Sequence, residues 1–170
     1  KSQVRYQDML LQQIARNSLS LVESPFGNYA VQHALDEWGG PSCTPIFLSL
    51  QGRMTELSVQ KFSSNVVEKL FSVAPQEFRA TFIAELTEPE KMAVVVNSNY
   101  GHYVVKRALE TAEPAQVRAL LEAIRCNLGQ LPNRRLRAKW EKVMNAGKDR
   151  LDARPARAGV RPPSSAAPRE

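Results

Sequence analysis

The sequence predicts an all-α protein in which a unit of paired helices is repeated and stacked into a solenoid. Three observations lead to this fold class. Apolar residues recur at helical spacing along most of the 170 residues, and the alternation typical of strands is absent from the sequence. Three eight-residue segments, called phrases here, also share one pattern of polar and apolar residues. They lie at offsets of 36 and 38 residues, as in two-helix repeats. Such units bury their apolar sides against one another, so a continuous core is expected.

Each unit is expected to open with an apolar helix. Leu10, Ile14 and Leu21 show the helical spacing in the first of these helices. A short break follows each of them. A short apolar run at Met92–Val96 is not assigned to a helix. The expected first helices span residues 7–22, 44–58, 77–86 and 115–127.

A second apolar helix follows each break, and three of these second helices superpose without gaps. The superposed phrases read NYAVQHAL, SNVVEKLF and HYVVKRAL, and they begin at Asn28, Ser64 and His102. At about 100° per residue, the first, second and fifth positions share one side of the helix, and the apolar positions fall on the opposite side. The polar sets are therefore expected to line up along one solenoid surface. The expected second helices span residues 28–38, 64–74, 102–112 and 134–146.

The chemistry of these polar sets favours recognition of unpaired bases. A polar stripe can also be a plain solvated face, but such faces usually carry Lys and Glu. Asn28 and Gln32 each offer a donor and an acceptor, as the edge of a nucleobase requires. Tyr29 and Tyr103 offer flat surfaces on which bases stack. Two edge readers and one stacking residue, repeated at a regular spacing, indicate a base-reading surface.

The net charge of +6 is unevenly distributed, which bears on how a nucleic acid would be held. Residues 1–114 carry 10 Lys and Arg against 12 Asp and Glu, a net charge of −2. The net charge is +5 for residues 115–147 and +3 for residues 148–170. A protein that binds chiefly phosphates would spread its cations more evenly. The earlier part of the chain must therefore read bases if it binds nucleic acid.

Other classes of function find little support in the sequence. No apolar run approaches the length of a membrane span. Cys43 and Cys126 stand far apart, with no CxxC pair or His cluster, which argues against a zinc site and for a reducing compartment. His33 and His102 have no evident catalytic partner, and no phosphate-cradling Gly loop is present. We expect no enzyme and no cofactor, with His33 packing on a helix surface.

The three phrases and the residues before them resemble the second helices of neighbouring Pumilio-homology (PUF) repeats. The sequences in question are FGNYAVQHAL, FSSNVVEKLF and YGHYVVKRAL, and the segment from Pro114 to Met144 resembles the capping pseudo-repeat. Their order is most similar to the last three repeats and cap of an eight-repeat domain, which fits a chain that lacks its beginning. The resemblance implies a right-handed, armadillo-like α-solenoid of two- or three-helix repeats. We expect repeats at about 7–42, 43–76 and 77–113, a cap at 114–146, and a disordered basic tail rich in Pro, Ala and Arg at 147–170.

The resemblance also implies RNA-binding roles for individual residues. In the first repeat the family's edge readers fall on Asn28 and Gln32, with Tyr29 stacking, a combination that reads uracil. The chemistry agrees, because two amides can satisfy the imide N–H and the carbonyls of uracil together.

In the second repeat the edge readers fall on Ser64 and Glu68, and Asn65 takes the stacking position. A carboxylate accepts from N1–H and N2–H₂ of guanine, which is the physical reason for a guanine assignment. The alternative for Glu68 is an ion pair with Lys61 or with a neighbour of Lys69.

The third repeat and the cap depart from this pattern. His102 and Lys106 replace the Asn and Gln of a uracil-reading repeat, while Tyr103 keeps the stacking position. Lys carries donors only, so the base read here stays open. The cap has Arg134, Arg135 and Ala138 at the equivalent places and is not expected to specify a base. Its cations either hold phosphates or keep a terminal repeat soluble.

The function that this resemblance implies is sequence-selective binding of single-stranded RNA, read as 5′-N-G-U-3′. Relatives of this kind regulate messenger RNA in the cytoplasm through 3′ untranslated regions, with protein co-regulators, and we expect a monomer. PUF relatives in nucleolar ribosome assembly are an alternative. Another alternative is an armadillo-like scaffold that binds protein, although Trp38 and Trp140 form no spaced Trp ladder.

Overall fold

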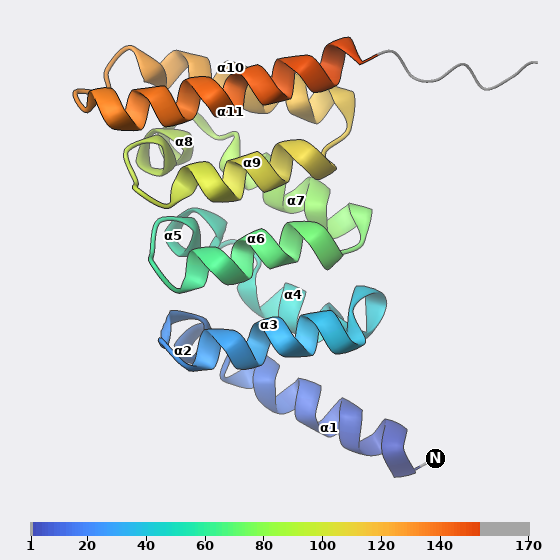
Figure 1. Cartoon of the computed structure of the whole chain (residues 1–170). Helices are drawn as coiled ribbons and strands as arrows, with labels where there is room; N and C mark the ends of the chain where they lie inside the picture. The colour runs from blue at the N-terminus through green and yellow to red at the C-terminus, as the bar shows by residue number, and fades with distance from the viewer. Residues whose placement is uncertain (1, 154–170) are drawn as a thin grey trace, which may run out of the picture.

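The computed structural model describes residues 2–153, and within this range the chain forms helices and no strand. The helices stack into a solenoid that rises in Figure 1 from α1 at one end to α10 and α11 at the other. The all-α solenoid predicted from the sequence is confirmed. The chain starts with α1 (Ser2–Arg16), α2 (Ser18–Glu23) and α3 (Gly27–Trp38), then a short 3₁₀ helix, η1 (Gly40–Cys43).

The same succession of helices is then repeated, and a longer helix pair closes the stack (Figure 1). The second group is α4 (Thr44–Leu50), α5 (Met54–Ser58) and α6 (Ser63–Val73). The third is α7 (Gln76–Leu86), α8 (Pro89–Val96) and α9 (Gly101–Thr111). The last pair is α10 (Pro114–Leu128) and α11 (Arg134–Asp152).

The first segment of each repeat is a pair of helices, so the single helices predicted for residues 7–22 and 44–58 are wrong. The first of them breaks at Asn17, whose side-chain Nδ2 donates to the Gln13 carbonyl at 2.9 Å. The second breaks at Gly52, whose φ of 80° favours glycine. Pro89 starts α8 as a separate helix, because proline lacks the N–H that a continued α7 would need.

The apolar run at Met92–Val96, which the sequence left unassigned, is the C-terminal half of α8 and is largely buried. Each repeat therefore consists of three helices, one of the two forms that the resemblance implies. The repeat limits inferred from the resemblance remain predictions.

Helix α11 continues beyond residue 146, so the expectation that a tail starts at residue 147 is wrong. Gly147 is buried where α11 crosses its neighbours, and a Cβ there would lie 2.9 Å from Leu121 Cδ2 and 3.3 Å from Leu109 Cδ1. The glycine serves a close approach of helices rather than a change to irregular chain. Residues 154–170 of the predicted tail lie outside the described residues.

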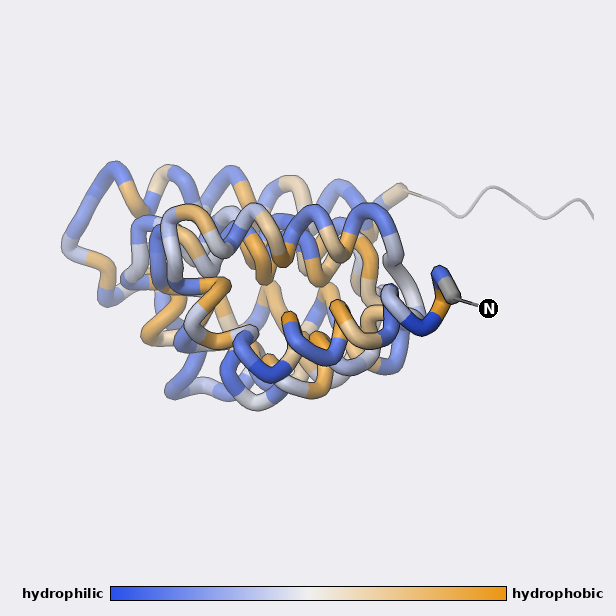
Figure 2. Tube along the Cα trace, turned by 90° about the horizontal axis from the view of Figure 1, so that it is seen from below, coloured by the Kyte–Doolittle hydropathy of each residue, from blue (hydrophilic) through white to orange (hydrophobic). Residues whose placement is uncertain are grey.

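A continuous apolar core runs through the stack between its two layers of helices. Figure 2 shows the hydrophobic residues gathered on the inner sides of both layers. Val31 and Leu35 of α3, and their counterparts in α6 and α9, are fully or almost fully buried, as their helical spacing predicts. Ala30 is exposed, although the same pattern placed it on the apolar side.

The described helices are too short or too polar to cross a lipid bilayer.

Candidate nucleic-acid interface

The predicted reading residues lie on three helices that are placed side by side. α6 packs between α3 and α9, and α11 packs against α9, so the four second helices form one layer of the solenoid (Figure 1). Because the three phrases start at the first turn of each helix, their polar sets lie in register along this layer. We call this surface, formed by the three sets of residues 28/29/32, 64/65/68 and 102/103/106, the ladder face.

A small residue at the start of each of these helices sets the register. A Cβ at Gly27 would lie 2.7 Å from the Leu21 carbonyl oxygen, and one at Gly101 would collide with the Val95 carbonyl oxygen. Ser63 in α6 is buried and donates its hydroxyl to the Leu57 carbonyl at 2.8 Å. We call α3, α6 and α9 the ladder helices. Each of them begins directly against the helix before it, and this contact fixes where its polar set lies.

In the first set, the side chain of Asn28 is buried and engaged within the protein. Its Nδ2 donates to the carbonyls of Ser24 and Pro25 at 2.8 and 3.1 Å, and its Oδ1 accepts from Gln32 Nε2 at 3.0 Å. Tyr29 is 67% exposed, and Gln32 is half-buried. Asn28 thus holds the Gln32 amide, and Gln32 and Tyr29 are the groups that a ligand can reach.

The second set follows the same arrangement. Ser64 is buried and donates to the Lys61 carbonyl at 3.3 Å, whereas Asn65 is exposed. The Glu68 carboxylate is half-buried, and its Oε1 lies 3.4 Å from an Arg107 guanidinium nitrogen of α9. Glu68 is therefore ion-paired, but across the repeat to Arg107 rather than to Lys61.

In the third set, His102 is packed between aromatic rings. Its ring centroid lies 3.9 Å from that of Tyr103 and 6.4 Å from that of Trp140, which meets it edge-on. Burial, assisted by the nearby charge of Lys139, lowers the pKa of His102 and favours its neutral form. Tyr103 is 53% exposed, and Lys106 is exposed.

The three sets correct one expectation about the ladder face. The first position of each set, occupied by Asn28, Ser64 and His102, is buried, although helical geometry placed it on the open surface. It lies in the first turn, where Asn28 and Ser64 bond to carbonyls of the preceding loop and His102 packs against Trp140 of α11, and the pattern of a single helix gives no sign of these neighbours. The second position is exposed in every set, so the surface open to a ligand consists mainly of the second and third positions.

The cap continues the layer with cations in place of amides and aromatic rings. Asn133 caps α11 by accepting from the Leu136 N–H at 3.1 Å. Arg134, Arg135 and Ala138 are exposed at the equivalent places, and Lys139 follows on the same helix. The ladder face therefore ends in positive charge.

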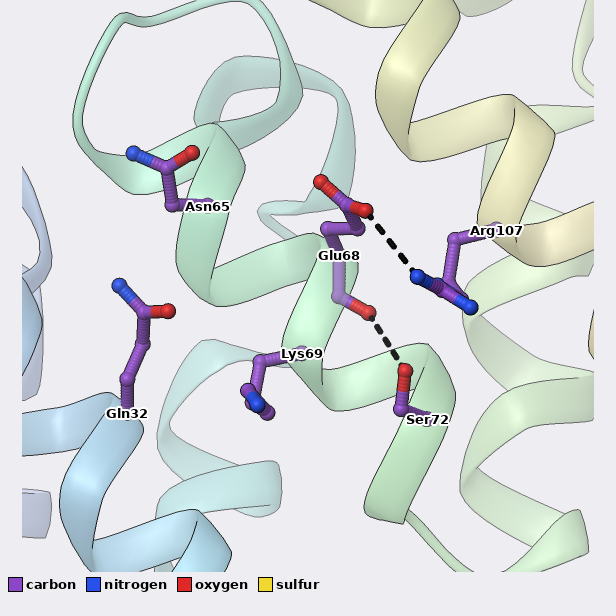
Figure 3. A pocket seen from close by; sticks show the side chains of 6 residues that line it. All are labelled: Gln32, Asn65, Glu68, Lys69, Ser72 and Arg107. Atoms are coloured by element: carbon purple, nitrogen blue, oxygen red, sulfur yellow. Dashed lines mark hydrogen bonds and ion pairs between the residues drawn. The ribbon is translucent and has the colours of Figure 1, made fainter.

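A polar cleft of about 210 Å³ opens beside the second set, and sequence reasoning missed its most basic residue. Figure 3 shows the Glu68 carboxylate turned toward Arg107, with Lys69 and Gln32 on the side of Glu68 away from Arg107. Arg107 follows Lys106 in the sequence, but its partner lies 39 residues away, so only a register drawn between helices could have found it. The residues that line the cleft are Gln32, Asn65, Glu68, Lys69, Ser72 and Arg107.

The cysteines and His33 lie apart from one another among the described residues. Cys43 is buried, which raises the pKa of its thiol, and Cys126 is exposed. His33 is exposed on α3. Within residues 2–153, no group of three or more His, Cys, Asp and Glu side chains gathers as a metal site would require.

Comparison with known proteins identifies the repeat. The model of the Pumilio-family RNA binding repeat matches residues 20–50, 53–87 and 99–125, which together make up more than half of the chain. Pumilio homolog 12 of Arabidopsis thaliana is 36% identical over 140 residues, covering 81% of this chain and 22% of the relative. A Pumilio domain-containing protein of Schizosaccharomyces pombe is 31% identical over 148 residues, covering 84% of this chain and 22% of the relative. The chain thus spans about a fifth of the length of these relatives.

Solved structures agree on the fold. PUF-8, solved in complex with PBE-RNA, superposes with a TM-score of 0.70 at 22% identity, over 84% of this chain and 43% of that one. The RNA-binding domain of yeast Puf5p, solved with SMX2 RNA, also gives 0.70, at 17% identity, over 86% of this chain and 43% of that one. The repeated phrases, the stacked three-helix units and the matching family model lead to one conclusion: the chain belongs to the Pumilio (PUF) family of RNA-binding repeat proteins.

Proposed function

We propose that this chain binds single-stranded RNA in a sequence-selective manner along the ladder face, and that it acts by binding rather than by catalysis. The observation that carries the proposal is the register of the three polar sets on α3, α6 and α9. The family supports it, and PUF-8 and Puf5p were both solved with RNA.

Single-stranded RNA suits the exposed side chains of the ladder face. Tyr29 and Tyr103 are each more than half exposed, on helices separated by α6, so they can stack only with bases that are free of a duplex. The first 114 residues carry a net charge of −2, so phosphate attraction alone would not hold RNA there. Base contacts must supply the affinity.

The bases follow from the reading residues. Gln32, held by Asn28, presents an amide for uracil, and Glu68 presents a carboxylate for the two donors of guanine. His102 is packed against Tyr103, so Lys106 is the exposed edge group of the third set and its base is not specified. With the antiparallel course that the family implies, the chain reads 5′-N-G-U-3′.

The biological role proposed from the family is regulation of messenger RNA in the cytoplasm, through 3′ untranslated regions and together with protein co-regulators. Puf3, which shares this fold, was solved with a 3′ UTR recognition sequence. A nucleolar role in ribosome assembly is the alternative within the family. We propose that the chain acts as a monomer.

The proposal is tested by binding of labelled RNA to the full 170-residue chain and to a Tyr29→Ala, Tyr103→Ala double variant. Single-stranded RNA containing UGU should bind better than the same sequence in duplex RNA. The double variant should lose about 1–3 kcal/mol for each stacked base. The variant Tyr6→Ala is the matched control, because it removes an exposed aromatic ring of α1 that is not part of the ladder face. It should bind RNA as wild type does. Equal affinity for duplex and single strand would contradict the proposal, and a chain that captures peptides instead would favour the scaffold alternative.

A further inference from the structure

The ladder helices are joined by ion pairs that run from each repeat to the one before it. Lys69 Nζ of α6 lies 2.8 Å from Asp36 Oδ1 of α3, and Arg107 of α9 lies 3.4 Å from Glu68 Oε1 of α6. Lys69 and Arg107 occupy the same place in their phrases, directly after the third reading position. A cation at this place therefore faces the acidic side chains of the preceding ladder helix.

The two cations differ in what they pair with, and one residue explains the difference. Asp36 lies four residues after the reader Gln32, and Ser72 stands at the same distance after Glu68. Lys69 can pair with Asp36 and leaves Gln32 to its contact with Asn28. The corresponding place before Arg107 is occupied by Ser72, which carries no negative charge. The guanidinium instead contacts the reader, Glu68, and the three residues line one cleft (Figure 3).

Arg107 is itself held in place, which makes it a support rather than a loose counter-ion. Its second terminal nitrogen pairs with Glu110 Oε2 at 2.7 Å, one turn further along α9. Its Nε is buried. The guanidinium therefore presents one terminal nitrogen to Glu110 of its own helix and the other to Glu68 of α6.

We propose that Arg107 is the positioning residue for guanine selection: it holds the Glu68 carboxylate in the orientation that accepts the two donors of guanine. A carboxylate has about four acceptor positions on its two oxygens, so Glu68 can keep Arg107 on Oε1 and still accept N1–H and N2–H₂. A free Glu68 side chain would have to be ordered by the base itself, and that ordering opposes binding. The inference rests on the proposed reading of guanine by Glu68.

The experiment compares three variants of the full chain for binding to RNAs that differ only in the central base. Arg107→Gln removes the support. Ser72→Asp restores an acid at the place that Asp36 holds in α3 and draws Arg107 away from Glu68. Lys69→Gln is the control, because it removes one cation from the same cleft, a cation that pairs with Asp36. The quantity measured is the ratio of Kd for adenine, cytosine or uracil to Kd for guanine, with folding checked by circular dichroism.

The ratio should fall about two- to fivefold in Arg107→Gln and in Ser72→Asp, as expected when one partly exposed ion pair is removed. The ratio should stay unchanged in Lys69→Gln, because loss of this cation changes the affinity for all four bases equally. An unchanged ratio in either of the first two variants, or an equal fall in Lys69→Gln, overturns the inference. A wild-type chain without guanine preference would instead refute the reading by Glu68, so the two failures are distinguishable.

Discussion

Asn28 shows how a single residue can serve folding and recognition together. Its amide closes the loop before α3 through two backbone carbonyls and also holds Gln32 at 3.0 Å. Reading residues on a rigid helix bind with less loss of conformational freedom when a neighbour fixes their rotamer. The buried Asn28 thus supports the reader Gln32, and its own contact with a base stays a prediction.

Replacing Asn28 with alanine should lower both stability and uracil selection. The Pro25 carbonyl would lose its side-chain donor, and the Ser24 carbonyl would keep only the backbone N–H of residue 28, at a cost of about 1–3 kcal/mol in the free energy of unfolding. Asn65→Ala is the matched control, because Asn65 is exposed and makes one long hydrogen bond of 3.4 Å to Lys61; it should change stability by less than about 0.5 kcal/mol. Urea unfolding measures the stability of the two variants, and binding of RNAs that differ only in the base opposite Gln32 measures uracil selection. Equal losses in the two variants would show that burial of the Asn28 amide carries no special stability.

His102 should make the fold sensitive to mild acid. Burial, then the charge of Lys139, lowers the pKa of His102 in the folded chain, so the unfolded chain takes up the proton first as pH falls. The free energy of unfolding should be constant above the unfolded pKa of about 6.5 and decline below it, by at most about 1.4 kcal/mol per pH unit. Urea unfolding between about pH 7.5 and about pH 5.5 tests this, a range that brackets the unfolded pKa. His102→Gln should flatten the decline, whereas His33→Gln, at an exposed site, should retain it.

At the scale of the helix, close contact at the start of each ladder helix decides where its side chains lie. A Cβ at Gly101 would collide with the Val95 carbonyl oxygen, which is backbone and cannot turn aside. The glycine therefore specifies the register of α9 against α8.

Gly101→Ala should cost about 1–3 kcal/mol of stability through this collision. Gly129→Ala is the opposite case, since its Cβ would meet no atom within 4 Å and its φ is −62°. That change should be neutral or stabilising by up to about 1 kcal/mol. Thermal unfolding of the two variants compares them. If Gly101→Ala is as stable as Gly129→Ala, the register of α9 does not depend on this contact.

The sequence predicted the second helices and the first helices at 77–86 and 115–127 well, but it merged α1 with α2 and α4 with α5 and left α8 unassigned, for a physical reason. Val66, Val67, Leu70 and Phe71 repeat with the helical period over a complete helix, and all are buried. The short helix α8 offers only about two turns, too few for a period to be distinguished from a buried strand. At the site, the positions of Tyr29 and Glu68 followed from the register. The burial of His102 and the role of Arg107 did not, because both depend on neighbouring helices.

For the whole molecule, charge and chemistry change from one end of the stack to the other. The ladder face carries amides, a carboxylate and aromatic rings, and it ends at α11 with exposed Arg135, Lys139 and Lys142. RNA running along the ladder face would meet these cations beyond its last stacked base. A phosphate contact there would add affinity without base preference.

Changing Arg135, Lys139 and Lys142 together to Gln should weaken RNA binding and lower its salt dependence. The log–log slope should fall by about 0.7 for each phosphate that the chain no longer neutralises. The preference for guanine followed by uracil should not change. Arg118→Gln, on the exposed side of α10, is the control and should leave the slope as in wild type. An unchanged slope in the triple variant would mean that these cations contact no phosphate and serve only to keep the terminal repeat soluble.

The two ends of the described stack are not equally protected, and this sets an order of opening. α1 leaves Tyr6 and Met9 72% and 65% exposed, whereas Trp140 of α11 is fully buried and donates to the Val96 carbonyl at 2.9 Å. Repeats that contact only their neighbours open from the least stabilised end inward. Amide hydrogens should therefore exchange fastest in α1 and slowest in α6 and α9. A bound RNA bridging α3 to α9 would then slow the opening of the helices that it spans.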